Sequence, residues 1–488
     1  MCNMLDFIGI GLGPFNLSLA SLLHKQNHLQ YQFFEKKPQF DWHAGMQLPN
    51  TVLQVPFMAD LVSMVDPTSP FSFLNYLKAQ QRLYKFYFLE QAQIPRREYN
   101  HYCQWVADQL EHIQYQSTVK AIYAQEQGFE VMVEQDGRFR RYQCRNLVIG
   151  SGNVPHLPQC LKDIQQQYPE RCLHSANYCN AELNHLKGNV VVLGSGQSSA
   201  EVFMDLFDRQ YLQDQTTTAQ FKLHWLTRSN GFFPMEYAPL GLEHFSPDYT
   251  AHFYQLSPEN KAELLKQQGL LYKGISAKTI RDIYQKLYHR SIGQNIQQTH
   301  LHAQVGLVAA EPHGAGIRLQ FQHKVTAEQF YLDADFVVAS TGYHSPEWQY
   351  LKYLKPLIQC DEFGRWKISQ DYRVQHDAVG EIFVQNQEMH SHGAGTPDLG
   401  LGAHRAAVIA NQLLGFNLYD LGDQAQSFQH FSPSENAEMH SMGIVKKSAP
   451  TNIQRPLSVK KTIANYAMNR NTTMPNKQEQ NAVKLEKL

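Results

Sequence analysis

The sequence predicts an α/β fold with two Rossmann-like domains. One observation is that a buried strand, a glycine turn and a helix follow one another at the N-terminus, and the same order returns at 189–207. Another is that two further short apolar strands, at 146–149 and 336–339, end in glycine turns. Alternation of strands with helices is typical of a parallel sheet covered by helices.

Length and composition narrow the class of protein. A chain of 488 residues fits about three domains at about 150 residues each. A hydrophobic fraction of 43% can fill a large core, and a net charge of −1 argues against a nucleic-acid binder with a diffuse basic surface. Seven cysteines without a CxxC motif argue against a disulfide scaffold, a zinc site or a CxxC disulfide reductase. We expect a cytoplasmic protein without a metal or an integral membrane segment.

The first glycine turn is expected between a strand at 5–10 and a helix from Pro14 to about Lys25, with a second strand at 31–35. Glycines in such a turn let the backbone approach a pyrophosphate at a helix N-terminus. The third glycine falls one residue early against GxGxxG, but Glu35 ends the second strand, where a carboxylate can bind ribose hydroxyls. The turn residues are Gly9, Gly11, Gly13 and Pro14. They predict a dinucleotide site.

The second turn has a different chemistry. No acid ends its following strand, expected at 223–227, and Arg228 stands there instead. A cation at this place suits a 2′-phosphate, although a surface salt bridge is the alternative for Arg228. The predicted binding residues of this turn are Gly194, Gly196, Gln197, Ser198, Ser199 and Glu201. Two sites, one with an acid and one with an arginine, indicate FAD and NADPH and therefore a flavoprotein oxidoreductase.

The stretch at 42–77 reads mostly as an apolar loop interrupted by prolines. Its place after the first βα unit suits the lining of a flavin pocket that excludes water. A loop that only packs against the core is the alternative.

That stretch resembles the flavin-dependent N-hydroxylating monooxygenases of siderophore biosynthesis, which act on lysine, ornithine or diamines. The resemblance spans about residues 5–415 in the family's order and includes four further motifs: GIGLGPFN at 9–16, GSGQSSAE at 194–201, STGY at 340–343 and HGAGTPDLGLGAHRAA at 392–407. It implies class B flavin monooxygenase architecture, in which NADPH reduces FAD, O2 adds to give a C4a-hydroperoxyflavin and a neutral primary amine attacks the distal oxygen. Members are commonly dimers or tetramers, so a homo-oligomer is expected.

The resemblance also assigns roles by position. Gln54 matches the glutamine whose amide lies close to flavin and nicotinamide, and is the candidate catalytic residue. Ser199, Glu201 and Arg228 match the NADPH-binding region. The residues matched to flavin contacts and to the segment that closes over the isoalloxazine, where a helix is expected to start near Leu401, are Trp42, His43, Met46, Thr341, Gly342, Tyr343, Asp398, Leu399 and Gly400.

The sequence departs from the amino-acid hydroxylases at the substrate. Their motif phenylalanine-leucine-lysine-aspartate, whose lysine binds the α-carboxylate, is here 57–60 with Ala59 at the lysine position. In a looser alignment, Leu242 replaces an asparagine ligand of the same head group. A carboxylate left without a cation in an apolar pocket is strongly disfavoured. Both changes favour a diamine such as putrescine or cadaverine, unless Lys273 or Arg281 replaces the missing lysine.

The second ammonium of a diamine needs an acidic or carbonyl partner, and Asp60, Glu236 and Glu243 are the candidates. Histamine would instead need stacking on Phe232, Phe233 or Tyr237. Lysine or ornithine N-hydroxylation remains the alternative within the class, and a non-catalytic flavin-binding module the alternative outside it. We expect a discontinuous FAD-binding domain at 1–180 and 340–430, and an NADPH-binding domain at 181–339 with its substrate-contacting segment at about 232–285. A polar tail is expected at 431–488.

Overall fold

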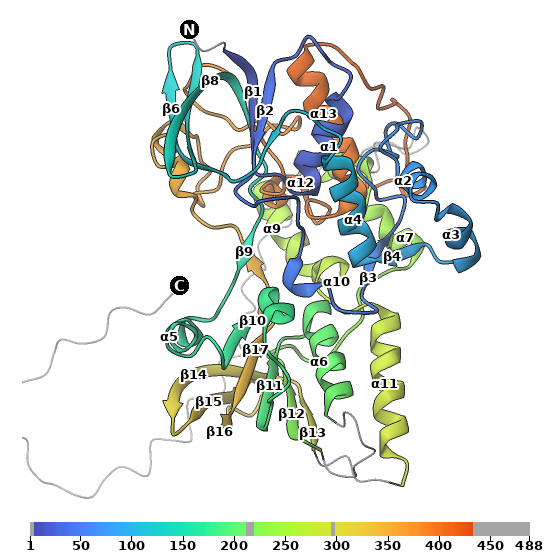
Figure 1. Ribbon diagram of the computed structural model, residues 1–488, viewed down its shortest axis with the longest axis vertical. Coiled ribbons are helices and arrows are strands. Elements are labelled where there is room, and N and C mark those ends of the chain that lie inside the picture. The colour runs from blue at the N-terminus through green and yellow to red at the C-terminus, as the bar shows by residue number, and fades with distance from the viewer. Residues whose placement is uncertain (1–3, 211–218, 294–297, 433–488) are drawn as a thin grey trace, which may run out of the picture. The chain divides into compact units, whose positions relative to one another are not determined.

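The computed structural model describes residues 4–210, 219–293 and 298–432. Within this part the strands gather in two main sheets with helices packed on them, which confirms the predicted α/β class (Figure 1). Both sheets belong to one compact unit. The polar tail predicted at 431–488 lies, from residue 433 onward, outside the described residues.

The first sheet has the order β5-β2-β1-β8-β7-β6, and β19 pairs with β8. Strands β2, β1, β8 and β19 run parallel, whereas β6 and β7 form an antiparallel extension. Their bounds are β1 (Leu5–Ile10), β2 (Tyr31–Phe34), β5 (Ile113–Gln114), β6 (Ser117–Gln125), β7 (Gly128–Gln135), β8 (Arg138–Ile149) and β19 (Ile382–Val384). The strands predicted at 5–10, 31–35 and 146–149 are thereby confirmed.

Three helices form a layer with this sheet: α1 (Pro14–Leu23), α4 (Arg96–Ala107) and α13 (Gly402–Leu414). Helices α1 and α13, far apart in sequence, lie side by side (Figure 1). Apolar side chains of α1 such as Leu17, Leu19 and Leu22 are fully or almost fully buried, because the helix lies between the sheet and its neighbours. The chain thus returns to its first sheet near the C-terminal end of the described residues.

The second sheet is wholly parallel, in the order β10-β17-β11-β12-β13. Strand β11 ends in the continuous apolar run 190–193, Val-Val-Val-Leu, because both faces of a parallel sheet are covered. The elements here are β10 (Cys172–His174), β11 (Gly188–Leu193), β12 (Phe221–Leu226), β13 (Thr299–His302) and β17 (Phe336–Ala339), with helices α6 (Gln197–Arg209) and α11 (Ala277–Ser291) on one face. Helix α5 (Gln159–Gln167) and the antiparallel strands β14 (Val305–His313), β15 (Gly316–His323) and β16 (Gln329–Ala334) pack on the other.

The chain passes between the two sheets along a short antiparallel pair, β9 (Val154–Pro155) and β18 (Tyr343–His344). Strand β10 already belongs to the second sheet. Helix α5, before β10, also packs on the second sheet, so the crossover at β9 precedes the expected boundary at residues 180 and 181. A three-residue strand carries no periodicity, so the sequence offered no signal for it.

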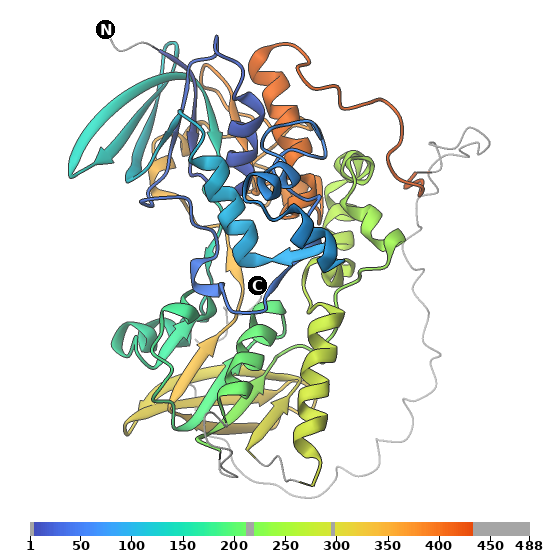
Figure 2. The ribbon, with the colours of Figure 1, turned by 45° about the vertical axis from the view of Figure 1, so that its right-hand side comes forward.

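Short helices lie between β12 and α11 in the chain (Figure 2). They are α7 (Pro239–Leu242), η3 (Glu243–Phe245), α8 (Pro247–Gln255), α9 (Pro258–Gln267) and α10 (Gly269–Tyr272), and α8 and α9 contact α12 (Met389–His392). Helices η4 (Gln349–Leu351) and η5 (Lys355–Leu357) pack on the first sheet, and η6 (Leu399–Leu401) precedes α13. A Cβ on Gly393 would lie 3.1 Å from the Phe253 ring, so the segment after α12 packs tightly on α8. The predicted substrate-contacting segment thus contacts the C-terminal segment.

The stretch at 42–77 is less irregular than expected. It contains η1 (Ala44–Met46), β3 (Val52–Pro56), which pairs with β4 (Gln93–Pro95), and the start of α2 (Phe73–Ala79), which α3 (Leu83–Leu89) follows. Helix η2 (Ser175–Asn180), which follows β10, packs against η1. Phe57, Phe73 and Phe86 pack their rings together beneath the stretch. The apolar residues of the stretch therefore build a local aromatic core.

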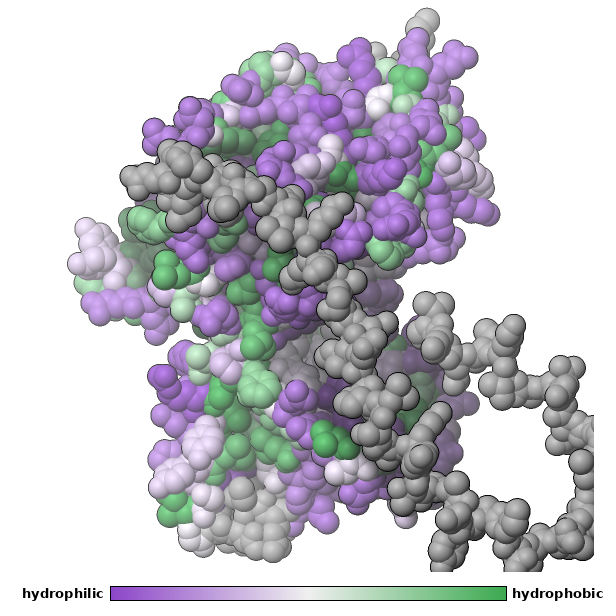
Figure 3. Space-filling view, turned by 180° about the vertical axis from the view of Figure 1, so that it is seen from behind, coloured by the Kyte–Doolittle hydropathy of each residue, from purple (hydrophilic) through white to green (hydrophobic). Residues whose placement is uncertain are grey.

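The surface carries both hydrophilic and hydrophobic side chains. On the face in Figure 3, hydrophilic side chains predominate and hydrophobic ones lie between them. Among the described residues, no helix is both long and apolar enough to cross a membrane.

Candidate functional site

The first glycine turn joins β1 to α1. Gly9 packs directly on the Phe33 ring, where a Cβ would overlap the ring. Gly11 has a φ of +78°, and a Cβ there would also lie 2.9 Å from the Gly150 carbonyl oxygen. A Cβ on Gly13, in contrast, would meet nothing within 4 Å. The turn is closed toward the protein at its first two glycines and open at its third, which is where a ligand can approach the backbone.

The two helices that follow the glycine turns begin without a side-chain cap, as α4, α5 and α13 also do. Helices α8, α9 and α11 each begin with a serine whose side chain accepts a hydrogen bond from a backbone N–H of the first turn. Helices α1 and α6 begin with Gly13 and Gly196, and no side chain caps them. Their first N–H groups are thus left for another acceptor, and the helix dipole favours an anion there. Both turns fit the pyrophosphate of a dinucleotide.

Glu35 lies directly at the first turn. Its Oε2 accepts a hydrogen bond from the Leu12 N–H at 2.7 Å, and its Oε1 accepts one from the Lys37 N–H at 3.0 Å. The side chain is buried. Each carboxylate oxygen keeps a second lone pair, so the group can also accept hydrogen bonds from two ribose hydroxyls. The predicted pairing of the glycine turn with an acid is present in the structure.

The second turn also has one glycine packed on the protein and one open glycine, and it contains serines. Gly194 has a φ of +140° and packs on the Ser340 backbone, whereas a Cβ on Gly196 would meet nothing within 4 Å. Ser199 is fully buried, and its Oγ donates to the Gly196 carbonyl at 2.7 Å. Ser198 lies in the first turn of α6. A small side chain at position 199 is tolerated because its hydroxyl finds a backbone acceptor.

Arg228 stands at the carboxyl end of β12, and its side chain is exposed. Beside it, the hydroxyls of Ser195 and Ser229 lie 2.8 Å apart and join the glycine turn to the residues after β12. Positive charge on Arg228 contributes to lowering the pKa of His156, after the larger effect of burial. An exposed cation beside an open turn suits a phosphate. Sequence reasoning placed Ser229 beside Arg228 but missed His156 as a residue of this region.

Glu201 does not face the open turn. Its carboxylate forms a bidentate ion pair with Arg96, in which Nη2–Oε1 is 2.8 Å and Nη1–Oε2 is 2.9 Å. Arg96 also donates to the Met46 carbonyl oxygen at 2.6 Å. The Met46 side chain, expected at the flavin, is buried in the core on the α6 side of the second sheet. Glu201 and Met46 therefore hold α6 and the 42–47 loop together through Arg96.

Gln54, on β3, continues this network. Its Nε2 lies 3.5 Å from the Oε1 of Gln197, and 3.0 Å from the Met235 Sδ. Gln197 in turn donates to Glu201 at 2.9 Å. The predicted catalytic glutamine is thus linked to the N-terminal turn of α6. Arg96 and Met235 were missed because nothing in their local sequence marks them.

The rings of Trp42, His43, Tyr343 and His174 contact one another in sequence. The ring centroids of Trp42 and His43 are 4.3 Å apart, and those of His43 and Tyr343 are 5.9 Å apart. His174 lies 5.3 Å from Tyr343, and burial lowers its pKa to about 4, so it is neutral at pH 7. Tyr343 is held in place by Thr341, whose hydroxyl donates to the His156 carbonyl, and by Gly342, whose carbonyl accepts from the His156 N–H at 2.9 Å.

The C-terminal segment begins a helix where expected, with η6 at Leu399–Leu401 and α13 from Gly402. Asp398 Oδ1 accepts from the Gly400 N–H at 2.7 Å, and Leu399 packs on the first core. Arg405 donates to the Thr396 carbonyl at 2.9 Å and pairs with the buried Glu388. Burial raises the pKa of Asp398 to about 6.

Ala59, the residue in place of the family's lysine, is buried. Its Cβ lies 4.0 Å from the position that a Cβ on Gly400 would occupy. The two alternative cations, Lys273 and Arg281, are both exposed. The Lys273 ammonium lies over the Tyr272 ring. Leu242 lies on α7 and is partly exposed. The part of the site around Ala59 and Gly400 is therefore lined without a lysine.

Two of the three predicted partners of a distal ammonium are already engaged. Asp60 is buried and accepts from the N–H groups of Val62, Ser63 and Phe73 and from the Ser63 hydroxyl. Glu243 accepts from the backbone N–H groups of Phe428 and Gln429, both at 2.9 Å. Glu236 is exposed and accepts from the Ala238 N–H.

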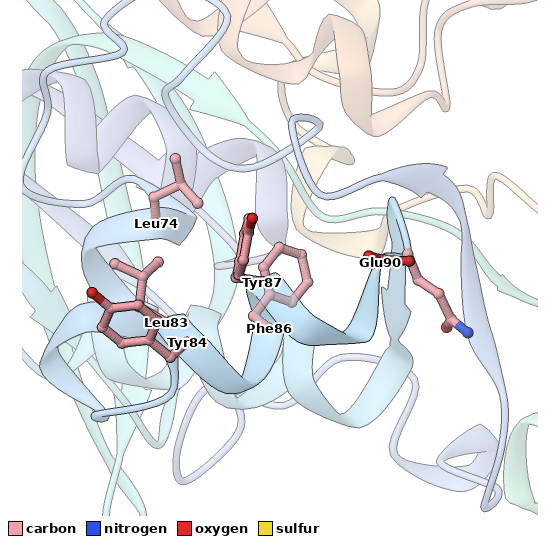
Figure 4. A pocket seen from close by; sticks show the side chains of 7 residues that line it. Leu74, Leu83, Tyr84, Phe86, Tyr87 and Glu90 are labelled. Carbon is pink, nitrogen blue, oxygen red and sulfur yellow. The ribbon is translucent and has the colours of Figure 1, made fainter.

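Two surface hollows lie away from these residues. One, of about 540 Å³, is an apolar hollow at α2 and α3, lined by Leu74, Leu83, Tyr84, Phe86, Tyr87, Glu90 and Gln91 (Figure 4). The other, of about 950 Å³, lies between α8 and residues 421–430. Neither contains a predicted cofactor or substrate residue. The described residues contain no cluster of metal-ligating side chains.

The fold and the two turns define an α/β oxidoreductase with two dinucleotide sites. Residues 3–345 match the model of the L-lysine 6-monooxygenase/L-ornithine 5-monooxygenase family, and the chain belongs to this family. It is a flavin-dependent N-hydroxylating monooxygenase.

Three similar proteins carry more specific names. The rhizobactin siderophore biosynthesis protein RhbE of Rhizobium meliloti is 43% identical over 87% of this chain and 94% of that protein. A putrescine N-hydroxylase of Shewanella oneidensis is 41% identical over 89% of this chain and 85% of that protein. The structure of DfoA bound to FAD, a cadaverine monooxygenase of the desferrioxamine pathway from Erwinia amylovora, has a TM-score of 0.81 at 34% identity, and the match covers 88% of this chain and 99% of that one.

Proposed function

We propose that this protein uses FAD, NADPH and O2 to N-hydroxylate a diamine, putrescine or cadaverine, and so supplies a hydroxylamine for a hydroxamate siderophore. The reaction consumes one amine, one O2, one NADPH and one proton, and yields one hydroxylamine, one water and NADP+. Bound FAD, once reduced by NADPH, supplies the activation of O2. The named relatives, which act on putrescine and cadaverine, support this choice of substrate.

The observation that carries the choice of a diamine is the buried Ala59. A lysine or ornithine substrate brings an α-carboxylate, which needs a cation in a site that excludes water. Alanine offers none, and the alternative cations Lys273 and Arg281 are exposed. A diamine has no carboxylate and is compatible with this lining.

The residues present fit both cofactors. We infer that FAD binds at the turn of Gly9, Gly11 and Gly13 with Glu35 on its ribose, and NADPH at the turn of Gly194 and Gly196 with Arg228 at its 2′-phosphate. The open positions at Gly13 and Gly196 support this. The uncapped starts of α1 and α6 support it as well.

The protein must present the amine in its neutral form, because an alkylamine with a pKa near 10.4 is almost fully protonated at pH 7. Desolvation shifts this equilibrium toward the neutral amine. The rings of Trp42, His43 and Tyr343 can exclude water from the reacting end. The Gln54 amide, fixed by Gln197 and Met235, is positioned to orient cofactor and amine without acting as an acid or base.

We infer a cytoplasmic location, since the six cysteines within the described residues are all free thiols, as expected in a reducing compartment. A homo-oligomer stays a prediction.

The test is to measure hydroxylamine formed from putrescine, cadaverine, histamine, lysine and ornithine under identical conditions with the FAD-loaded enzyme. We expect NADPH oxidation to be slow alone and to be coupled to hydroxylamine with the diamines. Preference for lysine or ornithine would show that Ala59 does not select the substrate, and preference for histamine would require a stacking pocket. Oxidation of NADPH without hydroxylamine from any amine would reject the activity itself.

A further inference from the structure

A diamine brings two nitrogen atoms that need different charge states. One nitrogen reacts in its neutral form, but the other stays an ammonium ion and must be held inside a site that excludes water. A buried cation is stable only beside an anion or a set of polar acceptors. The question, which rests on the proposed function, is which group of this chain receives it.

Asp398 meets the geometric requirement. Its Oδ1 lies 2.8 Å from the position that a Cβ on Gly400 would occupy, and the Ala59 Cβ lies 4.0 Å from the same position. The carboxylate and the alanine that replaces the family's lysine therefore flank one glycine. The Asp398 Oδ1 and the Ala59 Cβ are therefore less than about 7 Å apart.

The segment 235–237 lies near both Gln54 and Asp398. The Gln54 amide contacts the Met235 Sδ at 3.0 Å. Burial raises the pKa of Tyr237, two residues further on, and the charge of Asp398 raises it further, so Tyr237 lies within the electrostatic reach of that carboxylate.

Backbone N–H groups hold the carboxylate of Asp398. The Gly400 N–H donates to it at 2.7 Å, and the Leu401 N–H also donates to it. Arg405 attracts it, but this guanidinium is committed to Glu388 and to the Thr396 carbonyl. The phenols of Tyr99 and Tyr237 bring no charge, and burial raises the pKa of both. Asp60 accepts from backbone N–H groups through both of its oxygens, as Glu243 does.

We propose that Asp398 binds the distal ammonium of the diamine and determines the preference for a doubly charged chain over a monoamine. Ala59 complements it, because a lysine at this place would pair with Asp398 and occupy the site. The pair Ala59 and Asp398 thereby selects a cationic far end where the amino-acid hydroxylases select an anionic one.

The test compares matched substrates in the FAD-loaded enzyme: putrescine against n-butylamine, and cadaverine against n-pentylamine. Each pair shares the reacting end and differs in the distal ammonium. In Asp398→Asn the amide oxygen can still accept from the Gly400 N–H, so the start of η6 and α13 is preserved. We expect the KM for the diamine to rise at least about 30-fold, as for loss of one partner of a buried charge pair, and the KM for the monoamine to change less than about 3-fold.

Three measurements accompany the kinetics. FAD content of Asp398→Asn should match that of the wild type, its Tm should not fall below the wild-type value, and calorimetric titration with putrescine should show the same loss of affinity. Asp398→Ser serves as a second variant that also caps a helix. Asp333→Asn, an exposed carboxylate paired with Arg318 on the β15–β16 sheet, is the control for removal of a charge elsewhere.

Each outcome decides the proposal. Equal losses for diamine and monoamine would make Asp398 a structural part of the closing segment, and unchanged kinetics would place it outside the site. A selective loss in Glu236→Gln instead would transfer the role to Glu236. If the wild-type enzyme hydroxylates monoamines and diamines equally well, the distal anchor is rejected while N-hydroxylation stands. If it hydroxylates neither, the proposed function itself fails.

Discussion

Arg96 and Glu201 form a buried bidentate ion pair that joins α4, packed on the first sheet, to α6, packed on the second. The two residues are separated by 105 positions in the chain. Through Gln197 this pair also reaches Gln54. One ion pair thus fixes the predicted catalytic glutamine relative to the start of the second nucleotide helix.

Arg96→Met should destabilise the protein and uncouple its reaction. Removing one partner of a buried pair leaves Glu201 as an uncompensated charge, which costs about 3–5 kcal/mol. We expect a lower free energy of unfolding in denaturant, and more hydrogen peroxide per NADPH because Gln54 loses its support. The double variant Arg96→Met with Glu201→Gln should recover part of the stability but not the coupling. Equal stability of wild type and single variant would show that the pair contributes nothing.

Arg228 should determine the choice between NADPH and NADH. Arg228→Gln removes the cation beside the open second turn, so we expect the KM for NADPH to rise about 10-fold or more, as for loss of a charged hydrogen bond. The KM for NADH, which has no 2′-phosphate, should change little. Steady-state oxidation of both nucleotides measures the ratio of the KM for NADPH to the KM for NADH. The ratio for Arg228→Lys should fall between those of the wild type and Arg228→Gln. Parallel changes for both nucleotides would favour the surface salt bridge considered for Arg228.

Much of the fold was accessible from the sequence because its signals are local. Apolar runs that end in glycine turns identified β1, β8, β11 and β17, and a polar strand end identified Glu35. Strand β10 was missed because three residues carry no periodicity.

The site was harder to predict than the fold. The sequence could name carboxylates but not their partners, so Asp60 and Glu243 were candidates although backbone N–H groups engage both. Met46 and Glu201 were assigned to cofactors by position, whereas the chain uses them to hold two elements together. Such roles arise from residues that only the tertiary fold brings together.

Ala59→Lys should abolish efficient use of diamines. The new ammonium would lie beside Asp398, pair with it, and repel the distal ammonium of the substrate. We expect the KM for putrescine to rise at least about 30-fold, measured as hydroxylamine formation. Ala59→Leu adds bulk without charge, so a larger effect of lysine isolates the electrostatic part. Unchanged kinetics in Ala59→Lys would place residue 59 outside the site.

The preference for diamines should depend on pH through Asp398, whose pKa burial raises to about 6 from an ordinary value near 3.8. Below this pKa the carboxyl is neutral and cannot attract an ammonium. The ratio of kcat/KM for putrescine to that for n-butylamine should therefore fall as the pH decreases from 7.5 to 5, and protonation of the reacting amine cancels in the ratio. In Asp398→Asn the ratio should be low and independent of pH.

Stability supplies the complementary test of the same group. Because the carboxyl of Asp398 has a higher pKa in the folded than in the unfolded state, the folded state binds the proton more tightly between about pH 4 and pH 6. The stabilisation that this carboxyl contributes is fully present below its pKa in the unfolded state. It is lost as the pH rises through its pKa in the folded state. Asp398→Asn should therefore gain in Tm relative to the wild type between pH 5 and pH 7.5.

In the wild type, saturating putrescine should raise the Tm more at pH 7.5 than at pH 5, since only the ionised carboxylate binds it. A ligand-induced rise in Tm that is equal at the two pH values would show that a group other than Asp398 receives the ammonium.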